Sequence, residues 1–230
     1  GAAYMNEAFF ALPEEKRQRI LNAALEAFAK HEYKKASTDD IAAKAGISKG
    51  LLFYYFHNKK ELYLYLLEYA NEAVRRAAQE ANLREETDFF EMLEKGARAK
   101  TGILEQNPYL LDFTVRSFYS SQEEVSQAVA ASYQQKVGSA FPDYFSHIDF
   151  SKFREGADPA YLFRMLTWMT DGYMHEARQR GIPVDSGTVM EEFRRWSQIF
   201  RRMVYREEET GGAPGGKPEE PAQEKGADTE

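Results

Sequence analysis

The segment from residue 38 to residue 56, TDDIAAKAGISKGLLFYYF, most constrains the fold of this 230-residue chain. Gly46 follows a short run with helical periodicity, at a position where the backbone commonly becomes left-handed and a Cβ is costly. Ser48 has the side chain of an N-cap residue and directly precedes a second helical run. Two short helices joined by so tight a turn are typical of the helix-turn-helix unit, whose second helix fits the DNA major groove.

The other positions of the segment agree with this interpretation. Thr38 is interpreted as the N-cap of the first helix, and Asp39 and Asp40 place negative charge at its positive end. The side chains predicted to face inward are Ile41, Ala42, Ala45, Leu52, Tyr55 and Phe56. Those left on the outer face of the second helix are Lys49, Gly50, Leu51, Phe53 and Tyr54. An ordinary helical hairpin with a few exposed aromatic residues is the alternative interpretation.

The segment and its flanks resemble the N-terminal signature of the tetracycline-repressor (TetR) family. The resemblance covers residues 13 to 65 and joins the turn to a Phe-x-x-Lys-x-x-Leu sequence that opens the next helix. It rests on Thr38, Ile41, Ala42, Ala45, Gly46, Ile47, Ser48, Gly50, Tyr55, Phe56, Lys59, Glu61 and Leu62. The family commonly has Thr where Leu51 stands and Tyr where Phe53 stands, with hydroxyls that tend to reach phosphate. Leu51 could instead contact a thymine methyl group.

Sequence-specific DNA binding is therefore the first functional hypothesis. Lys49 and Lys59 are expected to contact phosphate, and the small Ser48 and Gly50 would allow the backbone to approach closely. The predicted DNA-binding residues are Thr38, Ser48, Lys49, Gly50, Leu51, Phe53, Tyr54, Tyr55 and Lys59. A turn motif that binds a partner protein is the alternative, and it would show no salt-sensitive duplex binding.

The charge of the chain is unevenly distributed. The net charge is −7, but residues 1–60 hold ten basic and seven acidic groups. Residues 206–230 hold three basic and eight acidic groups. Because counterion release depends on the local basic face, the negative total does not exclude nucleic-acid binding.

The apolar pattern predicts helices nearly throughout the chain and no β-strand. The first helix is expected to start at Pro13. After the turn motif, helices are expected to begin at Lys59, at Thr87 or Asp88, at Asn107–Pro108, at Ser120 or Ser121, at Asp158–Pro159 and at Ser186. They are expected to end near Ala81, Gln106, Phe118, Gly138, Gly181 and Glu208, with an irregular segment over residues 141–156.

The expected fold is all-α, with an N-terminal three-helix helix-turn-helix DNA-binding domain followed by a C-terminal helical ligand-binding and dimerisation domain. The expected divisions are an N-terminal arm (1–12), the DNA-binding domain (13–58), the ligand-binding and dimerisation domain (59–205) and a disordered acidic tail (206–230). Residues 1–4 precede a methionine and are interpreted as a remnant of expression. The tail has too few apolar residues to bury, so it is not expected to fold.

The last two long helices suggest self-association. Apolar residues cover most of the helix circumference between Tyr161 and Met174, and such a helix must be covered on more than one side. A four-helix interface with a second copy is the preferred interpretation, and a purely intrachain core is the alternative. The resemblance implies a homodimer through residues 159–180 and 186–208, placed on a pseudo-palindromic operator.

Aromatic and methionine residues are frequent between residues 85 and 180. They can line adaptable cavities, and they also fill ordinary cores. The resemblance implies a pocket here for a small apolar or amphipathic effector. The residues expected to line it are Phe89, Tyr109, Phe113, Arg116, Trp168, Tyr173 and His175, with Arg116 or His175 as polar anchors. The helix that begins at Lys59 is expected to carry the signal from this pocket to the DNA-binding domain.

No pattern in the sequence indicates catalysis. The four histidines show no metal-ligand spacing, and neither a Gly-rich phosphate loop nor a hydrolase motif occurs. The chain has no cysteine, which excludes disulfides and thiolate zinc sites. No catalytic residue, metal or cofactor is therefore expected.

The sequence as a whole predicts a ligand-responsive transcriptional regulator that is not an enzyme. By the resemblance it is a repressor that binds a double-stranded DNA operator and an effector. No apolar run approaches the ~20 residues of a membrane span, and a cytoplasmic location is expected. A small-molecule carrier or enzyme built on the middle helices, or a partner-binding module, remains the alternative.

Overall fold

The chain folds into helices, and a computed structural model describes residues 7–107, 109–120, 124–131, 141–183 and 185–207. The α-helices are α1 (Glu7–Phe10), α2 (Glu14–Lys30), α3 (Thr38–Ala45), α4 (Lys49–Phe56), α5 (Lys59–Glu80), α6 (Phe89–Glu105), α7 (Leu110–Tyr119), α9 (Phe141–Tyr144), α10 (Pro159–Gln179) and α11 (Ser186–Val204). Short 3₁₀ helices span Leu83–Glu85 and Phe150–Lys152. Extended pairing in the described ranges is limited to an isolated bridge between Phe153 and Tyr205, so the predicted all-α class is confirmed.

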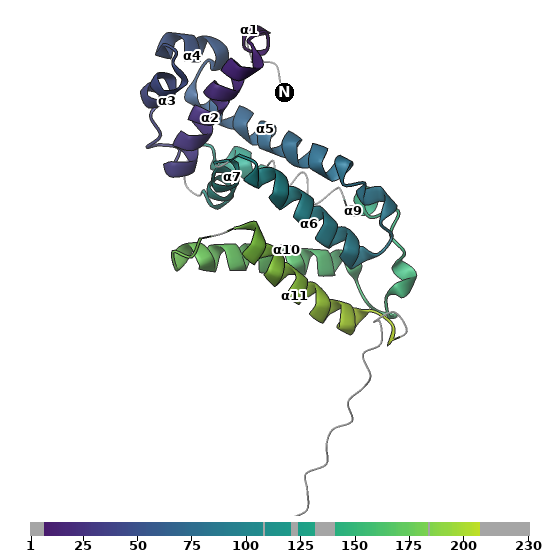
Figure 1. Cartoon of the computed structure of the whole chain (residues 1–230). Helices are drawn as coiled ribbons and strands as arrows, with labels where there is room; N and C mark the ends of the chain where they lie inside the picture. The colour runs from purple at the N-terminus through teal and green to yellow at the C-terminus, as the bar shows by residue number, and fades with distance from the viewer. Residues whose placement is uncertain (1–6, 108, 121–123, 132–140, 184, 208–230) are drawn as a thin grey trace, which may run out of the picture.

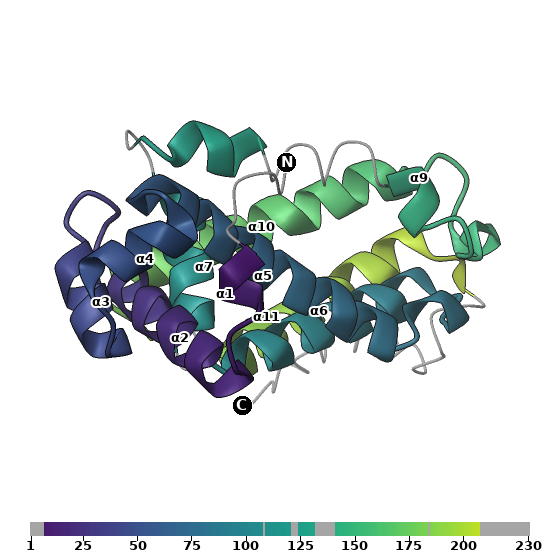
Figure 2. The same cartoon turned by 90° about the horizontal axis from the view of Figure 1, so that it is seen from above.

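The helices form an elongated molecule. Helices α1 to α4 make a compact group at one end, and α5 leads away from it (Figure 1). Helix α6 packs beside α5, and α7 packs back against α2. Helix α11 packs on α6, and α10 lies next to α11. In the view from above, α3 and α4 lie at the opposite end of the molecule from α9 (Figure 2).

The first helix of the turn motif begins one residue from the predicted cap. The Ser37 side chain, not that of Thr38, accepts a hydrogen bond from the Asp40 N–H at 3.2 Å. Ser37 has the extended backbone that an N-cap requires, whereas Thr38 is already helical. The prediction that Thr38 is the N-cap is therefore wrong, because either hydroxyl could cap and only the backbone conformation selects between them.

The turn itself follows the predicted pattern. Gly46 has a φ of 69°, in the left-handed region that favours glycine. The Ile47 N–H donates to the Ala42 carbonyl at 3.0 Å and closes the end of α3. Ser48 accepts a hydrogen bond from the Leu51 N–H at 3.1 Å and caps α4, as predicted.

Three aromatic rings join the α1–α4 group to the rest of the molecule. Phe28 of α2 lies edge-on to Tyr63 of α5, with ring centroids 5.0 Å apart. Phe113 of α7 is 5.3 Å from Tyr63 and 6.4 Å from Phe28. All three side chains are buried, so α2, α5 and α7 share one core. Such aromatic contacts contribute about 0.5–1.5 kcal/mol each beyond area burial.

The α1 helix lies within the segment that the sequence suggests is an arm. Phe9 is buried and packs on Phe56 of α4, with ring centroids 4.8 Å apart. A single four-residue turn leaves no periodicity to detect in the sequence, and its position is decided by the aromatic surface that α4 offers.

Asp88 organises the far end of the molecule. Its Oδ1 accepts hydrogen bonds from the N–H groups of Phe90 and Glu91, both at 3.1 Å, which caps α6 as predicted. Its Oδ2 accepts from Lys152 at 3.1 Å and from Arg201 at 2.9 Å. One buried carboxylate thereby ties α6 to the second 3₁₀ helix and to α11.

Helix α11 begins at Ser186, as predicted, but ends before the predicted residue. Asp185 caps it by accepting a hydrogen bond from the Thr188 N–H at 2.9 Å. It ends at Val204 and not near Glu208, because the Val204 carbonyl accepts from the Arg154 N–H at 2.8 Å. The sequence around Val204 contains nothing that indicates this pairing with a distant segment.

The remaining helix predictions fall close to the structure. Helices α5 and α10 begin where predicted, at Lys59 and Pro159, and Asn58 and Asp158 cap them. The segment expected to be irregular contains α9 and a 3₁₀ helix. Of the helix expected from Ser120 or Ser121 to Gly138, residues 126–131 are helical, and the segment 132–140 lies outside the described residues. Residues 208–230 of the acidic tail also lie outside them.

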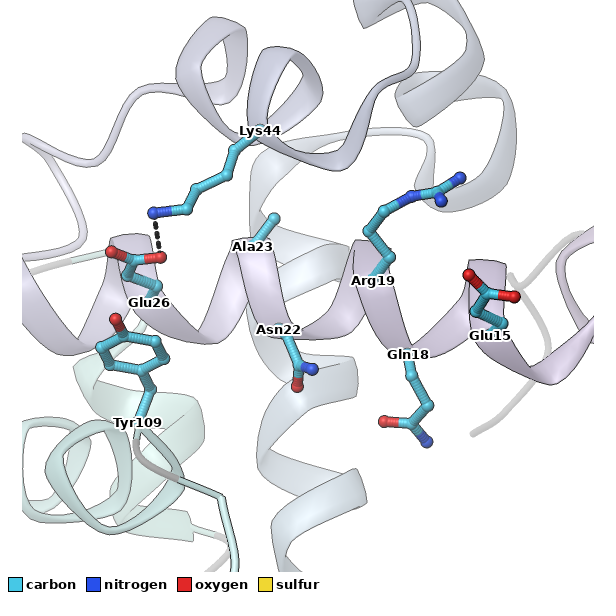
Figure 3. A pocket seen from close by; sticks show the side chains of 8 residues that line it. All are labelled: Glu15, Gln18, Arg19, Asn22, Ala23, Glu26, Lys44 and Tyr109. Atoms are coloured by element: carbon cyan, nitrogen blue, oxygen red, sulfur yellow. Dashed lines mark ion pairs between the residues drawn. The ribbon is translucent and has the colours of Figure 1, made fainter.

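Glu26 joins α2 to the elements on either side of it (Figure 3). Its side chain is only 10% exposed; it accepts a hydrogen bond from Lys30 at 2.5 Å and pairs with Lys44 of α3. Those two ammonium groups, together with a hydrogen bond from the Tyr109 hydroxyl, lower the Glu26 pKa from 4.5 to about 2. Tyr109 directly precedes α7, so this carboxylate connects α3, α2 and α7.

We expect Glu26→Gln to change the acid dependence of stability. A depressed folded-state pKa means that the Glu26 carboxylate stabilises the fold above pH 4.5 and that this contribution is lost as pH falls toward 2. The variant should unfold at lower urea concentration than the parent near neutral pH, and the difference should shrink in acid. Urea titrations across this pH range measure it.

Glu15→Gln is the matched control, since Glu15 is an exposed glutamate on the same helix. It should leave the acid dependence unchanged. Parallel stability curves for the parent and Glu26→Gln at all pH values would refute the role assigned to Glu26.

Candidate nucleic-acid interface and ligand cavity

Helix α4 presents one face to the core and one to solvent. Leu52 and Phe56 are fully buried against the first core cluster, as predicted. On the other face, the Tyr54 side chain is 56% exposed, and Lys49 and Gly50 are exposed. Leu51 and Phe53, also predicted for this face, are half-buried at its edge, and the capping Ser48 is exposed. The end of the molecule that carries α4 thus has an accessible polar and aromatic surface.

Tyr55 does not belong to this surface. Its side chain is only 4% exposed, and its ring centroid is 5.8 Å from that of Phe9. The assignment of Tyr55 to the DNA-binding set is therefore corrected: the same helical periodicity that predicts it inward excludes it from a groove. Thr38, in the same predicted set, is half-buried in the first turn of α3.

The two lysines predicted to contact phosphate have different surroundings. The Lys49 ammonium donates to Asp39 at 2.9 Å and lies 6.0 Å from the Phe53 ring centroid. The Lys59 ammonium donates to the Lys34 carbonyl at 3.3 Å and lies 4.7 Å from the Tyr33 ring centroid. The Lys49 and Asp39 side chains of this ion pair are 47% and 69% exposed, so a phosphate could replace Asp39 as the partner of Lys49 at little cost.

Two exposed lysines beside this surface are absent from the predicted set. Lys34 and Lys35 lie in the loop between α2 and α3, and the backbone of Lys34 contacts Lys59. Two consecutive lysines just before the turn motif are the signal that could have indicated them.

A cavity of about 340 Å³ lies between α6, α7, α10 and α11. Each helix contributes side chains spaced three, four or seven residues apart, as one helical face requires. Its walls are Ala97, Lys100, Thr101, Leu104, Leu111, Thr114, Val115, Phe118, Tyr119, Thr167, Thr170, Asp171, Met174, Asp185, Ser186, Val189 and Phe193.

None of the seven residues predicted to line a pocket lies on this wall. Phe89 and Phe113 are fully buried in the two core clusters, and Tyr109 contacts Glu26. Arg116 donates to the Ala29 carbonyl at 2.7 Å, on the side of α7 that faces α2. These four residues contact neighbouring helices, and none of them reaches this cavity.

The three predicted residues on α10 point away from the cavity. Trp168 is 50% exposed, Tyr173 packs on Trp196 with ring centroids 5.9 Å apart, and His175 is exposed beside Gln179. The cavity face of α10 instead carries residues 167, 170, 171 and 174. The prediction selected the largest rings, whereas the angular position on the helix decides which side chains reach this cavity.

Ionisable side chains also line this largely apolar cavity. Burial lowers the pKa of Lys100 and raises that of Asp171, and each group partly offsets the shift of the other. The Tyr119 hydroxyl donates to the Asp171 carbonyl at 2.8 Å, and burial raises the Tyr119 pKa to about 12. The cavity therefore combines an apolar surface with a small polar region at the junction of α6, α7 and α10.

Other features of the described residues do not suggest a catalytic centre. A shallower depression of about 420 Å³ on α2 is lined by charged and amide side chains, and its Glu26 and Lys44 are already paired (Figure 3). His, Asp and Glu side chains form no group that could hold a metal in the described ranges. None of the helices there has the length and apolar character that a bilayer span requires.

Comparisons with known proteins identify the turn motif. The family model described as bacterial regulatory proteins, tetR family, matches residues 20–66. The transcriptional activator FasR of Mycolicibacterium smegmatis is 30% identical over 116 residues, which is 50% of this chain and 52% of FasR. The regulator SrpR of Pseudomonas putida is 45% identical over 49 residues, 21% of this chain and 23% of SrpR. The chain thus matches about half the length of these relatives, or less.

Solved structures share the fold over most of the chain. The SmeT–triclosan complex superposes with a TM-score of 0.63 at 19% identity, covering 90% of this chain and 100% of SmeT. The fatty acid degradation regulator FadR of Bacillus halodurans has a TM-score of 0.62 at 19% identity, covering 78% of this chain and 96% of FadR. Residues 20–66 thus form a helix-turn-helix domain of the tetR family of bacterial regulatory proteins, and the all-helical body behind that domain shares the fold of these solved structures.

Proposed function

We propose that this protein is a ligand-responsive repressor that binds a pseudo-palindromic DNA operator as a homodimer. The observation that carries the proposal is the exposed face of α4, held outward by a fully buried inner face of the same helix. Major-groove recognition requires a rigid helix of this kind. The relatives include FasR, named an activator, and SCO4008 of Streptomyces coelicolor, named a repressor. Release of DNA on ligand binding is the behaviour we assign to this chain.

The exposed face would make two kinds of contact with DNA. Lys49 and Lys59 would supply charge for phosphate, and Thr38, Ser48 and Gly50 would lie close to the DNA backbone. Tyr54 is the most exposed aromatic group of α4 and is placed to reach a base edge or sugar. Phosphate contacts position the protein, and base contacts specify the sequence.

The apolar surfaces of α10 and α11 support a homodimer. The large apolar side chains exposed on them are Tyr161, Trp168, Ile199 and Met203, at 50%, 50%, 53% and 62%. Apolar patches this accessible commonly mark protein interfaces. A two-fold partner on these helices would give a four-helix interface and present two α4 helices to successive major grooves.

Two routes would connect the cavity to α4. Helix α5, the route expected from the sequence, starts directly after α4 and packs on α6, which forms one cavity wall. Helix α7 forms one cavity wall with Thr114, and through Arg116 and Tyr109 it contacts α2. A ligand that fits better when α7 is displaced would change the angle of the α1–α4 group, and only its differential affinity for the two states drives release.

Selection of duplexes from a random pool tests the proposal directly. Enrichment of a two-fold symmetric sequence is expected, with half-sites about one helical turn apart. Recovery of no preferred sequence would contradict it.

We expect Lys49→Ala to weaken binding to every duplex, because phosphate contact is independent of base sequence. The slope of log K against log salt should fall by about one phosphate equivalent, ~0.9. Fluorescence anisotropy over a salt series measures both quantities. Lys95→Ala on α6 removes the same charge from an exposed lysine elsewhere and should change neither; an unaltered slope in Lys49→Ala would remove Lys49 from the interface.

We expect Met203→Glu to convert the dimer to a monomer, because it places a charge in the apolar four-helix interface. Sedimentation equilibrium should then give the mass of a single chain. Phe10→Glu is the control, since Phe10 is 50% exposed on α1 and lies outside this interface. A dimer that survives the Met203 substitution at micromolar concentration would locate the contact elsewhere.

A further inference from the structure

We propose that the ligand of the α6–α7–α10–α11 cavity is an uncharged amphipathic molecule whose hydroxyl group accepts a hydrogen bond from Lys100 and donates one to Asp171. This inference rests on the proposed function, in which the cavity holds the effector. It adds the chemical class of that effector, which the fold alone does not give.

The hydroxyl groups that line the cavity are already occupied as donors. Thr114, Thr167 and Thr170 each donate to the carbonyl four residues earlier in their own helix, at 2.8, 3.0 and 2.9 Å. Thr101 does the same on α6, at 3.0 Å. These side chains therefore turn methyl groups and weak acceptor positions toward a ligand, and they add little charge discrimination.

The polar groups at the mouth are occupied as well. Asp185 caps α11 through the Thr188 N–H at 2.9 Å, and Ser186 donates to Glu105 at 2.5 Å. The Tyr119 hydroxyl donates to the Asp171 carbonyl at 2.8 Å. Neither the Ser186 nor the Tyr119 hydroxyl can donate to a ligand without breaking a contact of the fold.

Lys100 is the exception on the wall. Within the described ranges its ammonium has no hydrogen-bond or ion-pair partner among the contacts of the fold, although it carries three N–H donors. Its side chain is exposed to the open cavity, so a ligand that fills the cavity would displace the water around it. An ammonium held this way gains from any acceptor that a ligand brings.

Asp171 lines the same cavity and carries the opposite charge. It attracts Lys100, since each group shifts the pKa of the other toward the charged form, but the two form no ion pair within 4.0 Å. Burial raises the Asp171 pKa, so its carboxylate also lacks part of the solvation it would have in water. A donor from a ligand would replace that solvation.

The balance of these two charges selects a neutral ligand. An anionic head group would pair with Lys100 but would stand beside the Asp171 carboxylate, which would then lose its counter-charge or take up a proton. A cationic group would have the same difficulty with Lys100. A hydroxyl both accepts and donates, so it can satisfy both groups and leave no buried charge unpaired.

The rest of the wall sets the size and polarity of the ligand. The apolar side chains around this polar region are Leu104, Leu111, Val115, Phe118, Met174, Val189 and Phe193. A volume of about 340 Å³ lies within the roughly 300–1,000 Å³ of small-molecule sites. An aliphatic or aromatic body with a single hydroxyl fits this description.

Four probes of matched chain length test the charge preference in the unaltered protein: octan-1-ol, octyl methyl ether, octanoate and octylammonium. Competition with a fluorescent apolar dye or calorimetry gives their affinities. Octan-1-ol should bind about tenfold or more tightly than the ether, which accepts but cannot donate, and more tightly than either ion. Tighter binding of either ion, equal binding of the alcohol and ether, or no binding of any probe would overturn the inference.

Two substitutions should invert the order of preference. Asp171→Asn leaves Lys100 without its counter-charge, so octanoate should overtake octan-1-ol. Lys100→Met leaves Asp171 without a counter-charge, so octylammonium should bind more tightly than octan-1-ol. Lys95→Met, on the same helix but outside the cavity, should keep the parent order. These tests compare probes within one variant, so they do not depend on equal stability of the variants. An order that stays the same in both cavity variants would also overturn the inference.

Operator binding separates this inference from the proposed function. If octan-1-ol binds with the expected preference but leaves operator affinity unchanged, the ligand class stands and the regulatory role of the cavity fails. If operator affinity responds to an octyl ion and not to octan-1-ol, the regulatory role stands and the ligand class fails.

Discussion

The contact among Phe28, Tyr63 and Phe113 is the interaction on which the arrangement of this molecule depends. One ring comes from α2, one from α5 and one from α7, and all three are buried. It forms the aromatic part of the core that α2 shares with α5 and α7. The α1–α4 group is thereby packed against α7, a helix that also borders the cavity.

Polar contacts around this aromatic core restrict how α2 can move. Glu26 binds Lys44 on one side and Tyr109 on the other, while Arg116 holds the Ala29 carbonyl at 2.7 Å. Arg19 of α2 donates to the carbonyl of Ala45, the last residue of α3, at 3.0 Å. Displacement of α7 is therefore coupled to α3, and through the Gly46 turn to α4. Close packing makes such a unit shift between discrete arrangements rather than deform gradually.

The selectivity proposed for the cavity depends on few polar groups. Its threonines donate to their own helices and so offer little polarity to a ligand. Lys100 and Asp171 carry opposite charges, and we expect these two residues to separate neutral ligands from ions of the same size. A ligand that fills the cavity displaces water, and an unpaired charge is costly once it is removed from water.

The sequence by itself determined the helix-turn-helix unit and most helix starts. Gly46 needs a left-handed backbone, and Ser48, Asn58, Asp88 and Asp158 cap their helices through side chains a few residues away, so the information is local. The sequence could not decide between Ser37 and Thr38 as the N-cap of α3, because both side chains can cap a helix and only the backbone angles distinguish them.

Only the tertiary structure decided which residues face the cavity. Phe89, Phe113 and Trp168 look like pocket residues in the sequence, yet two fill cores and one is exposed on α10. The wall instead carries Lys100 and Asp171, which periodicity alone places on surfaces open to solvent. The rotation of each helix about its own axis is set by contacts between residues far apart in the chain. That non-local constraint is the physical reason why the sequence indicates a regulator with a ligand cavity but not the residues that line it.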